Sequence, residues 1–286
     1  MYPYKIITFP DGSGITLYEI FILIGVIAAL VLFRLLADRR QMPAKLQNLV
    51  LIGAVVSFVA GYGCAVLFQA FYNALATGEF VLDQGTGSTF YGGFIGGTVC
   101  MLLIYFIGGR VAFKTWQTPL QWLPVFVNIA AACVPLAHGF GRIGCLTAGC
   151  CHGGLTDSWI GMEQYVEISP GKYGWAKVVP IQLFEAIFLF VLAAAIVLLF
   201  LKKKNCGLSV YLIGYGVWRF IVEFFRTDDR GASFIPGLTP SQTTAIFLVV
   251  VGVLLAVLTP YLRKKFIDRP PDADGEVNEH DRERSE

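Results

Sequence analysis

Seven long apolar runs divide this chain, and they constrain its fold more than any other feature of the sequence. A helix needs about 20 residues to cross the roughly 30 Å of hydrocarbon in a bilayer, and each run is close to that length or longer. The composition agrees, because 56% of the residues are hydrophobic and only 15% are charged. The mean hydropathy is +0.64. These values exclude a soluble globular domain and predict an all-α polytopic membrane protein with seven transmembrane helices. The predicted spans are Ile15–Leu36, Leu46–Asn73, Phe90–Ile107, Pro119–Leu136, Ile181–Leu201, Gly207–Phe225 and Ser241–Leu262.

Lysine and arginine residues follow the first, third, fifth and seventh runs. Such residues collect on the cytoplasmic side of membrane proteins, so these connections are predicted to be cytoplasmic. The N-terminus then lies outside and the C-terminus in the cytoplasm. We expect no cleavable signal peptide, because the short run after Lys5 is broken by Pro10 and Asp11 and no small-residue cleavage site closes it. The basic residues concerned are Arg34, Arg39, Arg40, Lys45, Arg110, Lys114, Lys202, Lys203, Lys204, Arg263, Lys264, Lys265 and Arg269.

Two parts of the chain are not expected to lie in the membrane. Residues 267–286 are rich in charge and poor in aliphatic side chains, which is typical of a disordered tail, here cytoplasmic. The outer connection 137–180 is long for a helix bundle and predicts a small extracytoplasmic subdomain between the fourth and fifth helices. The transmembrane domain is therefore predicted to cover residues 1–266, with 137–180 as an insertion.

The stretch His138–Gly153 concentrates the reactive side chains of this sequence, with three of its seven cysteines and two of its three histidines. If the fourth helix continues past Leu136, then His138, Arg142 and Cys145 share one face. A cation and an imidazole beside a thiol favour the reactive thiolate. The purely structural alternative for His138 is a capping or hydrogen-bonding group at a helix end.

The other cysteines of this stretch, Cys150 and Cys151, are predicted to lie at the outer face together with His152, where oxidation is possible. The C-x4-C-C-H spacing matches no usual zinc motif, because C-x2-C pairs are the common pattern. No metal and no cofactor are therefore expected.

A second stretch places Tyr215, Arg219, Glu223 and Arg226 on one stripe of an otherwise apolar helix. Charge facing lipid would be untenable, so the stripe must face the bundle interior. Arg219 and Glu223 are spaced to pair with each other, which is the purely structural explanation. Arginine also suits a bidentate grip on phosphate, and Arg142 would enter the same leaflet. The pattern favours a phospholipid headgroup as substrate.

Several ordered blocks resemble the prolipoprotein diacylglyceryl transferase family. They are Tyr18 with Leu23–Gly25, FYGGFIGG at 90–97, GRIG at 141–144 with Gly153, PIQLFE at 180–185, YGVWRFIVEFFR at 215–226 and Gln242. The resemblance implies a seven-helix bacterial inner-membrane enzyme with its active site toward the outside. It also implies transfer of a diacylglyceryl group from phosphatidylglycerol to the lipobox cysteine of a prelipoprotein.

The resemblance assigns roles only where residues match. Arg142 and Arg219 match essential arginines that hold the phosphate, and Tyr18, Tyr215, Glu223 and Gly153 also match. Three positions depart from the pattern: Tyr91 stands for the family histidine, Cys145 for an asparagine and Cys150 for a glutamate. The phosphate grip is retained, whereas polar groups around the reacting centre are exchanged.

This exchange leaves the activation of the acceptor thiol open, because tyrosine is a poor base near neutral pH. His138 or His152 could act as the base, or a thiolate of Cys145 or Cys150 could attack the glyceryl carbon. The catalytic candidates are Arg142, Arg219, Glu223, Tyr91, His138, Cys145, Cys150, Cys151 and His152. The substrate-binding candidates are Arg142, Arg219, Tyr18, Tyr215, Gly153, Arg226 and Gln242.

The predicted function is thus a phospholipid-dependent membrane transferase. Its expected partners are phosphatidylglycerol or a related phospholipid and a prelipoprotein signal peptide or another thiol acceptor, with no nucleic acid. A thiol-based redox or metal-binding membrane protein on the same scaffold is the alternative. The two differ in whether phospholipid turnover depends on Arg219.

Overall fold

The computed structural model describes residues 5–10, 14–83, 86–169, 171–226, 235 and 237–266. The predicted tail 267–286 lies outside these described residues. Within them, seven helices are long and apolar enough to cross a membrane. The prediction of a seven-span, mostly helical membrane protein is confirmed. The helices are α1 Leu17–Arg39, α2 Ala44–Thr77, α3 Phe90–Leu103 continued by η1 Ile104–Gly108 and α4 Gly109–Phe113, α5 Gln117–Ala148, α6 Ile181–Leu201, α7 Gly207–Val222 continued by η2 Glu223–Phe225, and α8 Pro240–Phe266.

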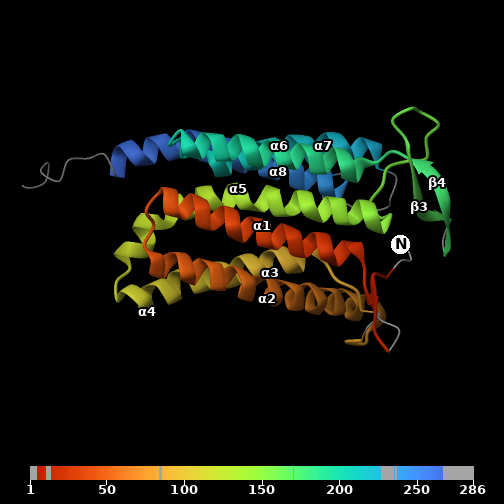
Figure 1. Cartoon of the computed structure of the whole chain (residues 1–286), viewed down its shortest axis with the longest axis horizontal. Coiled ribbons are helices and arrows are strands. Elements are labelled where there is room, and N and C mark those ends of the chain that lie inside the picture. Colours follow the sequence, from red (N-terminus) through yellow and green to blue (C-terminus); the bar gives the residue numbers. More distant parts are fainter. Residues whose placement is uncertain are drawn as a thin grey trace, which may run out of the picture.

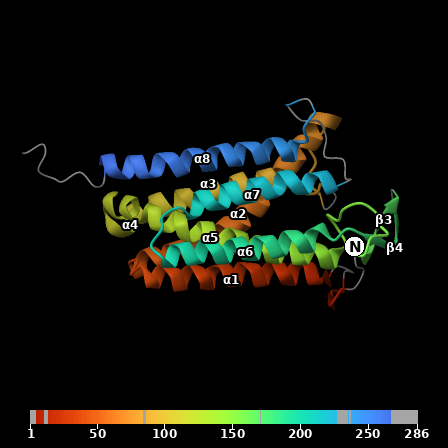
Figure 2. The same ribbon diagram turned by 90° about the horizontal axis from the view of Figure 1, so that it is seen from above.

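The helices form one elongated bundle (Figure 1 and Figure 2). The main packing pairs are α1 with α5, α2 with α3, α5 with α6 and α7 with α8. The connections after α1, α4 and α6 lie at one end, which we call the basic end, and the hairpin β3–β4 lies at the other, which we call the hairpin end (Figure 1). The basic connections of the sequence thus share one end of the bundle. That this end faces the cytoplasm stays a prediction from the charge pattern.

Glycines explain how α2 and α3 pack so closely. A Cβ on Gly61 of α2 would lie 2.9 Å from the carbonyl oxygen of Gly93, and one on Gly97 would lie 3.2 Å from that of Ser57. Small residues let two membrane helices approach backbone to backbone. The FYGGFIGG block therefore has a packing role in this chain.

The fourth span, α5, runs twelve residues beyond the predicted Leu136 and ends at Ala148. Gly149 closes it in the left-handed conformation, with a φ of 66°. The non-helical connection therefore begins at Gly149 and not at residue 137. The extension carries polar side chains on faces that meet other helices. The prediction required apolar side chains on every face of the helix and therefore ended the span too early.

The outer connection folds as a small antiparallel hairpin of β3 Met162–Ser169 and β4 Lys172–Val178, with Tyr165 opposite Trp175. A shorter strand pair, β1 Ile7–Thr8 with β2 Gly14–Ile15, precedes α1. The sequence predicted a subdomain here but no strands. Trp159 in the loop before β3 is 91% exposed.

The apolar core lies in the half of the bundle nearer the basic end. Tyr105 of η1 is fully buried and stacks on Phe126 of α5 with 4.5 Å between ring centroids. Its hydroxyl donates to the carbonyl oxygen of Pro119 over 2.8 Å, which satisfies the one polar atom of the ring. Phe33 and Leu46 complete this cluster from α1 and α2. The half nearer the hairpin end is where the buried charges gather.

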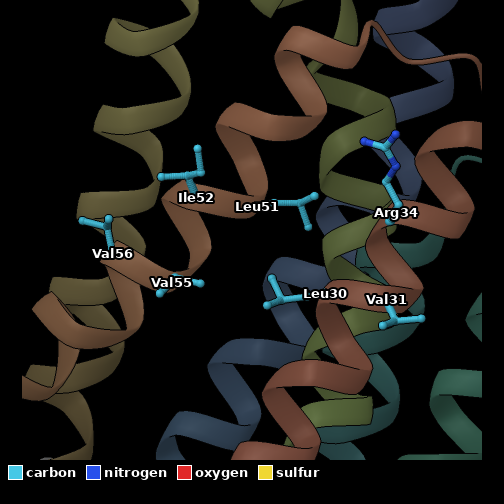
Figure 3. A pocket seen from close by; sticks show the side chains of 7 residues that line it. All are labelled: Leu30, Val31, Arg34, Leu51, Ile52, Val55 and Val56. Carbon is cyan, nitrogen blue, oxygen red and sulfur yellow. The ribbon is translucent and has the colours of Figure 1, made fainter.

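An apolar pocket of about 520 Å³ lies between α1 and α2 (Figure 3). It is lined by Leu30, Val31, Arg34, Leu51, Ile52, Val55 and Val56. None of the predicted site residues lines it. The polar chemistry of the chain is therefore separate from this pocket.

Candidate functional site

Glu185 of α6 is the centre of a buried charge network at the hairpin half of the bundle. Its side chain is fully buried. Its Oε2 lies 3.0 Å from Nε of Arg142, and its Oε1 accepts a 3.2 Å hydrogen bond from the Tyr215 hydroxyl. Nε2 of His138 is 3.9 Å from Oε1, and the His138 ring meets the edge of Tyr215. The network joins α5, α6 and α7.

The helical face predicted for α5 brings its polar side chains into this network. Because α5 stays helical to Ala148, His138, Arg142 and Cys145 follow one another along a single face. Two of the three contact Glu185. A buried arginine in a membrane protein needs such a partner, because an uncompensated charge there costs several kcal/mol.

A second buried ion pair lies on α7 and η2. Nη2 of Arg219 is 2.7 Å from Oε2 of Glu223, as the spacing predicted, and also donates to Oγ of Ser241 over 2.7 Å. Oε1 of Glu223 accepts from the Thr239 hydroxyl over 2.8 Å. Nη1 of Arg219 is buried and, within the described part of the chain, has no hydrogen-bond partner. A donor of a buried arginine therefore remains available to an anionic ligand.

Tyr215 connects the two pairs. It bonds Glu185 and lies one helical turn before Arg219, so both face the same side of α7. Tyr18 of α1 packs against Gly144 of α5. A Cβ on Gly144 would lie 3.1 Å from the Tyr18 ring. The structure thus brings together the predicted Arg142, Arg219 and Tyr215.

The three cysteines of the His138–Gly153 stretch also converge. The sulfur atoms of Cys145, Cys150 and Cys151 all lie within 4.8 Å of one another, and the side chains are half-buried. The convergence results from the helix end: Gly149 turns the chain, the amide of Cys150 bonds the carbonyl of Cys145 over 3.2 Å, and Cys151 adopts a φ of 62°. The linear spacing gave no sign of this grouping. It is the one group of ligand-type side chains in the described residues that could hold a metal ion.

The pKa values of the thiols in this group are shifted in different directions. Hydrogen bonds from Cys145 and Cys150 lower the pKa of the Cys151 thiol, and Arg226 and Arg142 act in the same direction. The pKa of the Cys150 thiol is raised, chiefly by its hydrogen bonds with Cys145 and Cys151 and then by burial. The lower pKa of Cys151 thus follows from its hydrogen bonds with the two neighbouring thiols and from the nearby guanidinium groups.

The loop after α5 is fixed from both sides. Nε2 of Gln182 donates to the carbonyl oxygen of Cys150 over 2.7 Å. The amide of Gly153 donates to the carbonyl of Val179 over 2.9 Å, and a Cβ on Gly153 would lie 2.9 Å from the carbonyl oxygen of Phe225. Gly153 is therefore needed for close packing, since no side chain fits between the loop and η2.

Other predicted site residues lie in different surroundings. The Tyr91 hydroxyl is 3.1 Å from Oγ1 of Thr244 on α8, and nearly half of the side chain is exposed. Gln242 forms a capping box with Thr239 at the start of α8: its Oε1 accepts from the Thr239 amide over 3.0 Å, and its own amide donates to the Thr239 hydroxyl over 3.2 Å. Nδ1 of His152 donates to the carbonyl of Gly153 over 2.8 Å.

Glu185 was not among the predicted site residues, although it lies in the PIQLFE block at 180–185. An acidic residue in the first turns of an otherwise apolar span is itself a functional signal in a membrane protein. Ser241 and Thr239 were also missed, and nothing in the local sequence distinguishes them from ordinary capping residues.

The comparisons with known proteins agree with these observations. A model of the family described as prolipoprotein diacylglyceryl transferase matches residues 6–258. The phosphatidylglycerol–prolipoprotein diacylglyceryl transferase of Clostridium tetani is 31% identical over 247 residues, covering 85% of this chain and 93% of its own length. A second enzyme of that name from Clostridium perfringens is 31% identical over 249 residues, covering 85% and 91%. One from Azoarcus is 30% identical over 251 residues, covering 83% and 88%.

The family model covers nearly all of the described bundle, including both buried ion pairs and the cysteine group. These matches support the interpretation as a transferase over that of a thiol-based redox or metal-binding protein. The chain is a multi-pass membrane protein that belongs to the prolipoprotein diacylglyceryl transferase family.

Proposed function

We propose that this chain transfers the diacylglyceryl group of phosphatidylglycerol to the thiol of a lipobox cysteine in a prelipoprotein. The observation that carries the proposal is the pair of buried arginines, each held by a glutamate, with Tyr215 bonded to Glu185 one helical turn before Arg219. The relatives that carry this activity in their names support the choice of substrates.

Arg142 and Arg219 are proposed to bind the lipid phosphate together. The buried Nη1 of Arg219 has no hydrogen-bond partner among the described residues, and this supports the role, because a phosphate oxygen would satisfy it.

The transfer exchanges one bond for another at the glyceryl carbon. The acceptor sulfur donates an electron pair to that carbon and forms a C–S bond, while the C–O bond to phosphate breaks and its electron pair leaves with glycerol phosphate. The leaving group gains negative charge, which two guanidinium groups at the phosphate stabilise. The proton of the acceptor thiol must be removed before or during this step.

Glu185 and Glu223 are proposed to orient the two arginines and not to react themselves. Each carboxylate fixes one edge of its guanidinium group and leaves the others for the substrate. Tyr18, Tyr215 and Gly153 are proposed to shape the headgroup site around them. Tyr91 is proposed to contribute little to deprotonation, since its hydroxyl lies against Thr244.

We further propose that the site opens to the outer leaflet of a bacterial cytoplasmic membrane. The charge pattern supports this orientation, because the buried pairs lie near the last turns of α5 and α7 and the first turns of α6, away from the basic connections after α1, α4 and α6. Phosphatidylglycerol would then enter from the outer leaflet, where a translocated signal peptide is also available.

The test is transfer from labelled phosphatidylglycerol to a lipobox peptide by the full chain in lipid vesicles, with the Clostridium tetani relative as a positive control. Arg219→Lys keeps the charge but loses the planar two-pronged grip. We expect at least a tenfold loss of kcat/KM, about 1.4 kcal/mol or more of transition-state stabilisation.

Arg34→Lys is the matched control, because Arg34 lies at the apolar pocket between α1 and α2. It should retain full activity. The proposal is wrong if the native chain transfers no label while the relative does, or if Arg219→Lys is as active as Arg34→Lys.

A further inference from the structure

The acceptor thiol has no obvious base at the position where the family pattern carries a histidine. Tyr91 stands there, and its hydroxyl contacts Thr244. A thiol reacts as the thiolate, so the missing base must be replaced. The same chain has three converging sulfur atoms near Arg142, and two of them, on Cys145 and Cys150, stand where the pattern carries asparagine and glutamate.

We propose that Cys145, Cys150 and Cys151 bind one Zn²⁺ as a three-thiolate site, and that the acceptor cysteine of the prelipoprotein binds the same ion as its fourth ligand. A thiol that coordinates zinc loses its proton outright. The ion would therefore supply the thiolate that the absent histidine cannot. The part about the acceptor rests on the proposed transferase function; the part about the metal site does not.

The geometry fits such a site. Zinc–sulfur bonds of about 2.3 Å in a tetrahedron place the sulfur atoms roughly 3.8 Å apart. The three sulfurs already lie within 4.8 Å of one another, so each pair needs to close by about 1 Å at most. Catalytic zinc sites have three protein ligands and keep the fourth position for water or substrate.

The surroundings hold the ligands in place and balance their charge. Gln182 fixes the carbonyl of Cys150 and also donates to Oε1 of Gln164 on β3, so α6 and the hairpin both support the loop. Three thiolates around Zn²⁺ carry one net negative charge. Arg142 and Arg226 act on these sulfurs as neighbouring positive charges and would offset it. Supporting hydrogen bonds and compensating charges of this kind tune metal sites generally.

The site also lies where the reaction needs a nucleophile. Arg142 and Cys145 are three residues apart on the same helix and face the same side. A phosphate held by Arg142 would place its glyceryl carbon next to the open position of the metal. On binding, the acceptor thiol gives its proton to water; its sulfur then forms the C–S bond as the C–O bond to phosphate breaks, and zinc regains a water. No oxidant or reductant is consumed.

The first measurement is the zinc content of the purified full chain in detergent. We expect one zinc per chain, and loss of zinc in the variant Cys145→Ser, Cys150→Ser, Cys151→Ser. Cys206→Ser is the matched control, because Cys206 is also half-buried but lies at the start of α7. It should keep its zinc. A chain that stays metal-free after loading with Zn²⁺, or a triple variant that binds zinc like the parent, would overturn the site.

The second measurement tests whether the acceptor cysteine binds the zinc ion. It needs neither turnover nor the cysteine variants. X-ray absorption at the zinc edge of the native chain should show three sulfur ligands, rising to four with a lipobox peptide and staying at three with a peptide carrying serine at that position. An unchanged sulfur count would refute the acceptor part. A diacylglyceryl-modified enzyme cysteine in intact-mass spectra during turnover would do the same.

The outcomes separate the two proposals. Zinc bound by the three cysteines in a chain without transfer activity would refute the proposed function and leave the metal site standing. Full transfer activity in chelator-treated, zinc-free protein would refute the metal role and leave the transferase function standing.

Discussion

Glu185 illustrates how a single buried carboxylate organises several polar side chains of a membrane site. It accepts a hydrogen bond from Tyr215 and pairs with Arg142, while His138 lies just beyond hydrogen-bond distance. Each partner comes from a different helix or turn, so the carboxylate fixes their relative positions. A membrane interior supplies no water to replace such a partner.

Glu185→Gln should therefore damage both stability and activity. The amide can still accept from Tyr215 but leaves Arg142 as an uncompensated buried charge, for which losses of about 3–5 kcal/mol are typical. We expect a clear drop in thermal stability in detergent and at least a tenfold lower kcat/KM. Glu163→Gln on the exposed face of β3 is the control and should behave like the parent. Parent-like turnover by Glu185→Gln would contradict the assigned role.

At the residue scale, the arginines and the α7 stripe were readable from sequence because an intramembrane charge is rare and its helical spacing is local. The partner of Arg142 was not readable in the same way. Glu185 is separated from it by the whole hairpin, and only the packing of α5 against α6 places their side chains together. The same holds for Ser241 beside Arg219.

At the scale of elements, α5 is the helix on which the site is built. It packs against α1 on one side and α6 on another, and its length decides that His138 and Arg142 belong to the bundle. The contact with α1 depends on Gly25. A Cβ there would lie 2.9 Å from the carbonyl oxygen of Ala137 and 2.9 Å from Cβ of Phe140.

Gly25→Ala should push α1 away from α5. We expect a loss of about 1–3 kcal/mol, as for other overpacked sites, seen as a lower melting temperature in detergent together with reduced transfer activity. Gly63→Ala on α2 is the matched control, because a Cβ added at Gly63 would meet nothing within 4 Å. It should melt at or above the parent temperature, since alanine is the better helix former. Equal melting curves for the two variants would refute this explanation of Gly25.

Sequence analysis located the elements well and their ends less well. Each apolar run became a helix, because the need for apolar side chains in hydrocarbon acts on every residue of a span. The end of α5 was placed twelve residues early, because its last three turns are polar on the side that meets other helices. The strands of the hairpin lie in a segment whose mixed composition gave no periodic signal.

At the scale of the whole molecule, the bundle separates two kinds of interior. The half nearer the basic end is filled by aromatic and aliphatic side chains around Tyr105. The two buried ion pairs and the sulfur group lie toward the hairpin end, because their residues come from the last turns of α5 and α7 and the first turns of α6. The apolar packing and the candidate site thus occupy different halves of the bundle.

The predicted orientation is testable with an impermeant thiol reagent on intact cells. Trp159→Cys, in the exposed loop before β3, should be labelled from outside more strongly than the parent chain. Lys202→Cys, at the exposed C-terminal end of α6, should exceed the parent only after the cells are broken. The opposite result would invert the orientation and place the phosphate site toward the cytoplasm.

The sequence by itself determined the class of protein, the number and order of the spans, the sharing of one end by the basic connections and the face of α7 that carries charge. These properties follow from local composition and helical periodicity, which need no knowledge of neighbours. Only the tertiary structure decided that Arg142 is held by Glu185 and that three cysteines of irregular spacing meet. Contacts of this kind depend on where a helix ends and what packs beside it, and no local pattern encodes that.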